Sequence, residues 1–374
     1  MNRRLALAQL ASLSALPLWS RAQDQKKIVL GQSAPLSGPA AQLGLQMQAG
    51  AKLYFDGVNA SGGIGGLPVE LRTLDDGYEP ERCKANTEQL ISSHVFALFG
   101  YVGTPTCLAA LPLVQQSKIP FFAPLTGAEA LRDPANPWVF HLRASYNDET
   151  ALIVRQLTQL GLSKIAVFHQ DDAYGKAGLD GVVRALTQRK LTVHATATVQ
   201  RNSVDVAEAA RKLAASQPEA VVLISAYKSC AAFIRESRRA GYSGQFFNVS
   251  FVGTQALLDE LGREANGILV SQVMPYPFGV ATGVVAEYQA AAQKAGGSHV
   301  LNYTAMEGFL AAKVLSEGLR RINGKGSREA LVSALESLQN YNAGGFPVKF
   351  GPGRHVASNF VELSMLTGDG KVKR

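Results

Sequence analysis

The stretch Val95–Gly127 has a strand–helix–strand pattern that restricts the fold more than any other feature of the chain. Two short apolar runs, Phe96–Gly100 and Ile119–Ala123, lie among glycines and prolines. They are too short for buried helices and are typical of strands buried on both faces. Between them, Leu108–Gln116 has apolar residues at a helical spacing. Because such a βαβ unit has parallel strands and a right-handed crossover, the sequence predicts an α/β fold.

The loop after the first of these strands has the composition of an anion-binding helix start. Thr104 is a suitable N-cap, Pro105 suits the first helical position, and Thr106 follows. The first N–H groups of a helix have no intrahelical partner, and the helix dipole favours negative charge there, so the loop predicts a carboxylate site. A purely structural role, in which Thr104 only caps its helix, stays open. The loop Pro124–Gly127 ends the next strand at the same sheet edge, which favours the binding interpretation.

The α/β alternation occurs twice, which predicts two Rossmann-like lobes joined by a multi-strand hinge. The first lobe is expected to contain residues 23–144 plus 275–345, and the second residues 145–274 plus 346–374. At the end of the chain, Phe346–Phe350 and Ser358–Thr367 predict a strand pair around a turn. Two lobes with facing sheet edges predict a cleft for a small molecule between them.

Residues 1–22 have the pattern of a cleavable signal peptide, which predicts export to the periplasm. Arg3 and Arg4 precede the apolar segment Leu5–Leu18, and Ser20-Arg21-Ala22 matches a small-x-small cleavage site. Without this segment the chain has 34 basic and 29 acidic residues, a net charge of +5. The basic residues are scattered and form no stripe interleaved with aromatics, so the sequence predicts no nucleic-acid partner.

The three cysteines leave two arrangements open. Cys83 and Cys107 lie on predicted neighbouring helices and could form a disulfide in an exported protein, with Cys230 left over. The alternative is three buried free thiols. There is no pair of cysteines at zinc-site spacing and no histidine cluster, so we expect no metal and no cofactor.

Catalytic groups in a usable spacing are missing from the sequence, so we predict that the protein is not an enzyme. Asp75 and Asp76 have no partner carboxylate or histidine at a matching spacing and are expected to be solvated loop acids. His169 is near a predicted cleft loop, but no Gly-x-Ser-x-Gly elbow accompanies it.

The chain resembles the periplasmic solute-binding proteins of the leucine/isoleucine/valine-binding type, which serve ABC importers. The resemblance covers about residues 27–367, in the right order, and implies the type I periplasmic binding protein fold. Proteins of that family bind amino acids, amides, urea and small carboxylic acids, including aromatic ones. The segments that carry the resemblance are Ile28–Gly38, Asn59–Gly66, Asp75-Asp76, Phe99–Thr106, Ile119–Thr126, Arg143–Asp148 and Asp171–Gly175.

The resemblance also implies the residues of the binding site. It places the ligand's carboxylate on four residues of the first lobe: Thr104, Leu125, Thr126 and Gly127. An aromatic residue that closes over the ligand corresponds to Tyr174, and a second tyrosine of the same lobe corresponds to Tyr227. Further aromatic residues that could line an apolar pocket are Tyr101, Phe251 and Tyr276.

One position departs from the family pattern. The acid that holds a ligand's ammonium would fall near Ser250, which cannot neutralise a charge. Either Asp172 or another acid supplies the countercharge, or the ligand lacks an ammonium. The family's small-loop disulfide is also missing, because Tyr78 and Gly103 stand where its cysteines usually lie.

The predicted function is therefore the substrate-binding component of an ABC importer. It would capture a branched-chain or other amino acid, or a small carboxylate that can be aromatic, and deliver it to a membrane permease. The alternative is a ligand-sensing module of the same fold, which the sequence does not distinguish from a transport protein.

Overall fold

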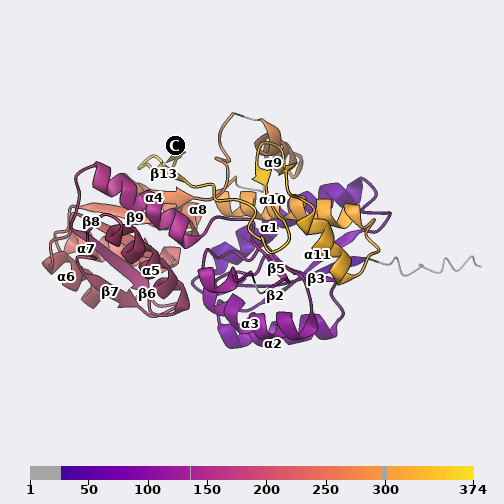
Figure 1. The fold of residues 1–374 in the computed structure, drawn as a ribbon. Coiled ribbons are helices and arrows are strands. Elements are labelled where there is room, and N and C mark those ends of the chain that lie inside the picture. The colour runs from indigo at the N-terminus through magenta and orange to yellow at the C-terminus, as the bar shows by residue number, and fades with distance from the viewer. Residues whose placement is uncertain (1–26, 135, 281, 297–300) are drawn as a thin grey trace, which may run out of the picture.

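The chain folds into two α/β lobes that lie side by side in the computed structural model (Figure 1). The structure describes residues 27–134, 136–280, 282–296 and 301–374. The predicted signal peptide, residues 1–22, lies outside the described residues. No helix within the described ranges is long and apolar enough to cross a membrane.

The first lobe is built on a five-stranded sheet in the order β2-β1-β3-β4-β5, and every strand pair in it is parallel. Its strands are β1 (Ile28–Ala34), β2 (Val69–Asp75), β3 (Ala97–Phe99), β4 (Phe121–Phe122) and β5 (Val139–Phe140). The helices packed on it are α1 (Ala41–Ala60), α2 (Pro80–Ser92), α3 (Thr104–Ser117), η1 (Glu129–Leu131), α9 (Gly283–Lys294), α10 (Tyr303–Arg321) and α11 (Arg328–Glu336). The predicted βαβ unit is therefore the β3–α3–β4 unit at the centre of this sheet.

The second lobe contains a seven-stranded sheet in the order β14-β13-β10-β9-β8-β6-β7. Its strands are β6 (Ile165–Gln170), β7 (Thr196–Val199), β8 (Ala220–Ile224), β9 (Gln245–Asn248), β10 (Leu269–Gln272), β13 (Glu362–Leu366) and β14 (Val372–Lys373). Its helices are α4 (Tyr146–Gln159), α5 (Ala173–Thr187), α6 (Ala207–Ala215), α7 (Tyr227–Arg239), η2 (Ser250–Val252), α8 (Thr254–Leu261) and η3 (Gly262–Ala265). The pairs from β10 to β7 are parallel, and β13 and β14 add antiparallel strands at the edge.

The chain passes between the lobes three times, after β5, after β10 and before β13. Two of these segments run parallel: the N–H of His141 donates to the carbonyl of His355 at 2.7 Å, and the N–H of Ala357 donates to the carbonyl of His141 at 2.8 Å. This places the last passage after residue 357 and not at the predicted boundary of 345 and 346. The predicted α/β class with two lobes and a multi-strand hinge is confirmed.

The predicted pairing of Phe346–Phe350 with Ser358–Thr367 is wrong. β12 (Pro347–Val348) pairs with β11 (Tyr341–Asn342) on the first lobe, while β13 pairs with β10 and β14 on the second. Phe350 packs edge-on against Phe140, which holds this segment to the first lobe. Local strand propensity does not determine which strand a segment pairs with. Here the pairing is determined by packing of each strand against the apolar core of its lobe.

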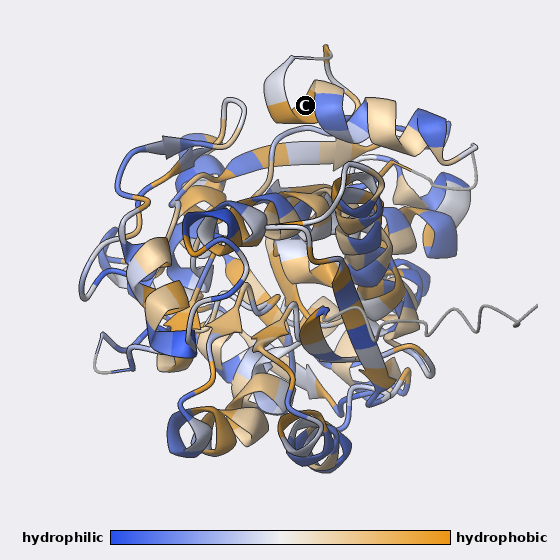
Figure 2. Ribbon diagram, turned by 90° about the vertical axis from the view of Figure 1, so that its right-hand side faces the viewer, coloured by the Kyte–Doolittle hydropathy of each residue, from blue (hydrophilic) through white to orange (hydrophobic). Residues whose placement is uncertain are grey.

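Helices α1 and α10 pack closely because each has a glycine at the crossing. A β-carbon on Gly50 would lie 1.8 Å from the carbonyl oxygen of Ala305, and one on Gly308 would lie 2.2 Å from that of Met47. Figure 2 shows hydrophobic residues concentrated on the inner strands, whereas hydrophilic residues lie on the outward faces of the helices. The carboxyl-terminal segment of the first lobe is therefore fixed to its amino-terminal helix by backbone contact.

The three cysteines are buried and free, so the candidate disulfide between Cys83 and Cys107 does not form. Burial raises the pKa of all three thiols and keeps them protonated. Tyr78 and Gly103 occupy the positions of the disulfide that is usual in the leucine/isoleucine/valine-binding type. Here the ring of Tyr78 lies against Gly103, and a β-carbon on Gly103 would lie 2.2 Å from Cε2 of Tyr78.

Candidate functional site

The start of α3 carries no side-chain cap. The N-cap is Gly103, which has a φ of 101°, and Thr104 is the first helical residue, so the prediction that Thr104 caps the helix is wrong. The hydroxyl of Thr106 donates to the carbonyl of Gly103. Because no side chain among the described residues caps this end, the helix retains donors for an external anion.

The hydroxyl of Thr104 instead bonds to Thr126 on the next loop, at an Oγ1–Oγ1 distance of 2.7 Å. Thr126 also accepts the N–H of Ala128 at 3.2 Å. Both threonines are buried, with exposures of 1% and 0%. The two predicted loops of the first lobe are thus brought together, as the carboxylate-site prediction requires.

Gly127 allows the hinge to approach this loop. A β-carbon on Gly127 would lie 2.6 Å from the backbone nitrogen of Tyr146, so no larger residue fits there. The N–H of Tyr146 donates to the carbonyl of Gly127 at 2.8 Å. The first residue of α4, which belongs to the second lobe, therefore lies directly against the loop of the first lobe.

Four aromatic side chains, which we call the aromatic arc, continue from this point to the opposite loop. Centroid distances are 5.3 Å between Tyr146 and Tyr174, 4.5 Å between Tyr174 and Phe251, and 5.9 Å between Phe251 and Tyr78. Tyr78 then contacts Gly103 at the start of α3. The aromatic arc thus joins both lobes around the two threonines, and all four members are fully buried or nearly so.

One hydroxyl group of the aromatic arc has no hydrogen-bond partner, and a second interacts with the threonine pair. The Oη atom of Tyr174 is buried and unpaired among the described residues, whereas the hydroxyl of Tyr146 faces Thr126. Burial raises the pKa of Tyr146 to about 12 and that of Tyr174 well above its usual value, so both hydroxyls stay protonated and can donate. A buried unpaired hydroxyl costs about 1–3 kcal/mol, which a ligand oxygen would recover.

The other residues predicted for the site lie in different surroundings. Tyr227 accepts the N–H of Gln42 at 3.4 Å, a contact between α7 of one lobe and α1 of the other. Tyr101 accepts the hydroxyl of Thr87 and lies in the core of the first lobe. Tyr276 donates to the carbonyl of Val372 at the end of the chain. Tyr101 and Tyr276 are therefore not part of the arrangement formed by Thr104, Thr126 and the aromatic arc.

Ser250 belongs to a buried charge network at the hinge. Nη2 of Arg143 donates to its hydroxyl at 2.6 Å, and Nε of Arg143 lies 3.1 Å from Glu307 on α10. The N–H and hydroxyl of Ser250 both donate to Glu149, at 2.7 and 3.0 Å. Burial raises the pKa of both glutamates, while the glutamates raise the pKa of Arg143. The pairing of these charged residues could not be predicted from the sequence, because the partners are far apart in the chain.

The acids of the loop after β2 are not both solvated as predicted. Asp75 is partly exposed and accepts the N–H of Leu36 at 2.8 Å. Asp76 is fully buried and accepts the hydroxyl of Ser33 and the N–H of Tyr78 at 2.7 and 2.8 Å. Burial raises the pKa of Asp76 to about 6. The tight turn that carries Tyr78 to the aromatic arc thus depends on this carboxyl.

A second set of contacts joins the lobes beside the aromatic arc. Nδ2 of Asn202 donates to Glu79 and to the carbonyl of Gly77, at 2.7 and 3.0 Å. Arg201 forms an ion pair with Glu79 at 2.9 Å, and Gln170 donates to the hydroxyl of Tyr78 at 3.2 Å. These bonds can exist only when the lobes are closed, so the structure represents a closed form.

Replacing Asn202 by glycine is expected to weaken closure and to speed ligand dissociation by about tenfold, since two hydrogen bonds between the lobes are lost. Glycine suits the site because Asn202 has a φ of 60°. Gln217→Gly is the matched control: it has a φ of 49° and is exposed. Stopped-flow dissociation measures the effect, and equal rates in the two variants would contradict it.

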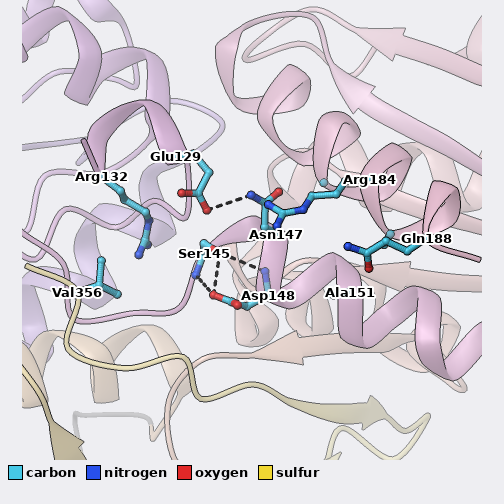
Figure 3. Close-up of a pocket in the computed structure, with 11 residues that line it drawn as sticks. Glu129, Arg132, Ser145, Asn147, Asp148, Ala151, Arg184, Gln188 and Val356 are labelled. Atoms are coloured by element: carbon cyan, nitrogen blue, oxygen red, sulfur yellow. Dashed lines mark hydrogen bonds between the residues drawn. The ribbon is translucent and has the colours of Figure 1, made fainter. Parts of the chain in front are cut away.

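The groove in Figure 3 lies on another side of the hinge. It runs between η1, the start of α4, and α5. Four of its polar side chains pair with one another: Asn147 donates to Glu129 at 3.1 Å, and Ser145 and Asp148 form a capping box. It contains none of the predicted site residues. No group of three potential metal ligands occurs within the described ranges.

Comparison with known proteins identifies the family of the chain. A family model described as periplasmic binding protein matches residues 27–371. The chain belongs to the periplasmic binding protein family. Members of this family bind ligands and are not enzymes, in agreement with the prediction from the sequence.

Individual relatives support the same assignment. A possible leucine/isoleucine/valine-binding protein from Rhodopirellula baltica is 35% identical over 92% of this chain and 95% of that one, with a TM-score of 0.87. A substrate-binding periplasmic protein from Ralstonia solanacearum is 33% identical, covers 93% and 99%, and has a TM-score of 0.88. A curated Leu/Ile/Val-binding protein homolog 7 from Brucella melitensis is 23% identical over 94% of this chain and 90% of its own. A fatty acid ABC transporter substrate-binding protein from Thermomonospora curvata shares the fold, with 20% identity, coverage of 92% and 90%, and a TM-score of 0.81.

Proposed function

We propose that this periplasmic binding protein is the extracytoplasmic substrate-binding component of an ABC importer. It captures an amino acid or a small carboxylate, which can be aromatic, between its lobes and delivers it to a membrane permease. Residues 1–22 direct export and are removed. Its relatives named for leucine, isoleucine and valine binding support the ligand class, and the fatty acid transporter protein of the same fold supports the transport role.

One observation carries this proposal: beside an uncapped helix start and a threonine pair on one lobe lie Tyr146 and, next to it, Tyr174 with an unpaired hydroxyl, both on the other lobe. The threonines and the N–H groups of α3 bind the carboxylate. Tyr146 and Tyr174 complete the site only when the lobes close. Closure is thus coupled to ligand binding, because the ligand gains contacts in the closed state that it lacks in the open one.

Transport is tested with candidate ABC permeases from the same organism, reconstituted in proteoliposomes. The liganded protein is expected to stimulate ATP hydrolysis by the permease, and the ligand-free protein to stimulate it less. Ligand binding without any stimulation would contradict transport and favour a sensing role.

Thr104→Val is expected to weaken ligand binding by about 1.5–3 kcal/mol, because it removes one hydrogen bond to a charged group while keeping the volume. Thr104→Ser, which retains the hydroxyl, is expected to bind close to the wild-type affinity. Isothermal titration calorimetry measures both, with the ligand that gives the largest thermal shift in a screen of amino acids and carboxylic acids. Equal affinity for the valine and serine variants would remove Thr104 from the site.

A further inference from the structure

The carboxylates around the proposed site are already occupied by groups of the protein itself. Glu149 accepts three hydrogen bonds, two from Ser250 and one from the hydroxyl of Ser271 at 2.5 Å. The charge of Glu307 is balanced by Arg143 at 3.1 Å. The hydrogen bonds to both carboxylates thus come from the protein itself, and both share the charge of Arg143.

Asp172, which the sequence analysis considered as a countercharge, is also occupied. Its Oδ1 accepts the N–H groups of Tyr174 and Gly175, and caps α5. Its Oδ2 accepts the side chain of Gln170 at 2.6 Å and lies 3.3 Å from Arg201. An ammonium placed beside it would have to displace a guanidinium that is already paired.

Two buried donors beside these carboxylates lack a partner. They are the hydroxyl of Tyr174 and Nη1 of Arg143. Arg143 lines a small hinge cavity together with Leu125 and Ser250, so it lies next to the carboxylate loop. Donors without acceptors match a ligand that is rich in oxygen and carries no ammonium.

The apolar part of the site is aromatic on both lobes. Tyr78 comes from the first lobe and Phe251 from the second, while Tyr146 and Tyr174 lie between them and the threonine loop. Rings prefer the faces and edges of other rings, at centroid distances like those within the aromatic arc. An aromatic ligand that enters between the lobes would therefore meet ring partners that a branched aliphatic ligand does not use.

We infer that the ligand is an aromatic carboxylic acid without an α-ammonium group. This inference rests on the proposed function and narrows its ligand class. The carboxylate lies at the start of α3 with Thr104 and Thr126, the ring lies within the aromatic arc, and the tyrosine hydroxyls donate to the ligand's oxygens. A zwitterionic amino acid would have to bury its ammonium beside carboxylates that already bind protein groups, which is costly.

Pairs of compounds that differ only in the ammonium test this inference on the mature protein. The pairs are 3-phenylpropionate with L-phenylalanine, and 4-methylpentanoate with L-leucine. We expect 3-phenylpropionate to raise the melting temperature most and neither amino acid to raise it, since only a bound ligand stabilises the folded state. A larger shift with either amino acid would overturn the inference while leaving the proposed capture of a small ligand intact. No shift with any of the four would overturn it as well, and the permease assay would still test transport separately.

Tyr174→Phe tests the assigned hydroxyl. It is expected to weaken binding of 3-phenylpropionate about tenfold or more, while the melting temperature of the ligand-free protein stays the same or rises, because an unpaired buried hydroxyl is removed. A purely structural hydroxyl would lower that temperature instead. Tyr101→Phe is the matched control: it removes a buried hydroxyl in the core of the first lobe and should leave affinity unchanged. Equal affinities for the two variants would overturn the assignment of Tyr174.

Discussion

Replacing Arg143 by glutamine is expected to lower the free energy of unfolding by about 3–5 kcal/mol at pH 8, because it leaves buried carboxylates without their cation. Arg143 is 2% exposed and lies 3.1 Å from Glu307, which is equally buried. It also donates to Ser250, which in turn donates to Glu149. Urea denaturation measures the loss.

The loss of unfolding free energy caused by Arg143→Gln should become smaller as the pH falls. Burial raises the pKa of Glu307 and of Glu149 in the folded protein, and removal of the cation raises both further. A carboxyl with a raised folded-state pKa contributes stability below its unfolded-state pKa, and this contribution disappears as the pH rises through the folded-state value. The difference between wild type and variant is therefore expected to be smaller at pH 4.5 than at pH 8.

Lys176→Gln is the control for a lost ion pair without burial. Lys176 and Asp180 form a pair one helical turn apart on α5, and both are exposed, so its loss should cost no more than about 0.5 kcal/mol. A loss for Arg143→Gln that is as small as this, or that does not change with pH, would show that the hinge network does not carry the assigned charges.

Gly50→Ala is expected to destabilise the first lobe by about 3 kcal/mol. The new methyl group would lie 1.8 Å from the carbonyl oxygen of Ala305, and a backbone atom cannot move aside as a flexible side chain can. Helix α1 would have to separate from α10, which loses packing along both helices. The midpoint of urea denaturation measures the effect.

Gly57→Ala, on the same helix, is the matched control. A β-carbon on Gly57 meets nothing within 4 Å, so the substitution should raise the free energy of unfolding by about 0.5–1 kcal/mol through helix propensity alone. A lower unfolding free energy for Gly50→Ala and a higher one for Gly57→Ala would show that Gly50 is required by close packing and not by helix propensity. Destabilisation of similar size at both positions would contradict this explanation.

The sequence alone determined the elements and the class of the fold. The strand–helix–strand pattern of Val95–Gly127 is the β3–α3–β4 unit. These signals are local: apolar periodicity and proline placement act within a few residues. The loops at the strand ends could be assigned for the same reason, because parallel strands bring their carboxyl ends to one edge.

Tertiary structure decided which groups are paired and which are left for a ligand. Thr104 bonds to Thr126 and does not cap its helix, and Asp76 is buried under a turn that looked solvated. Ser250 looked like the loss of a charge, but it belongs to a network that spans both lobes. Such pairings depend on distances between residues that are far apart in the chain, and the free energy of a buried polar group depends on its partners and not on its neighbours in sequence.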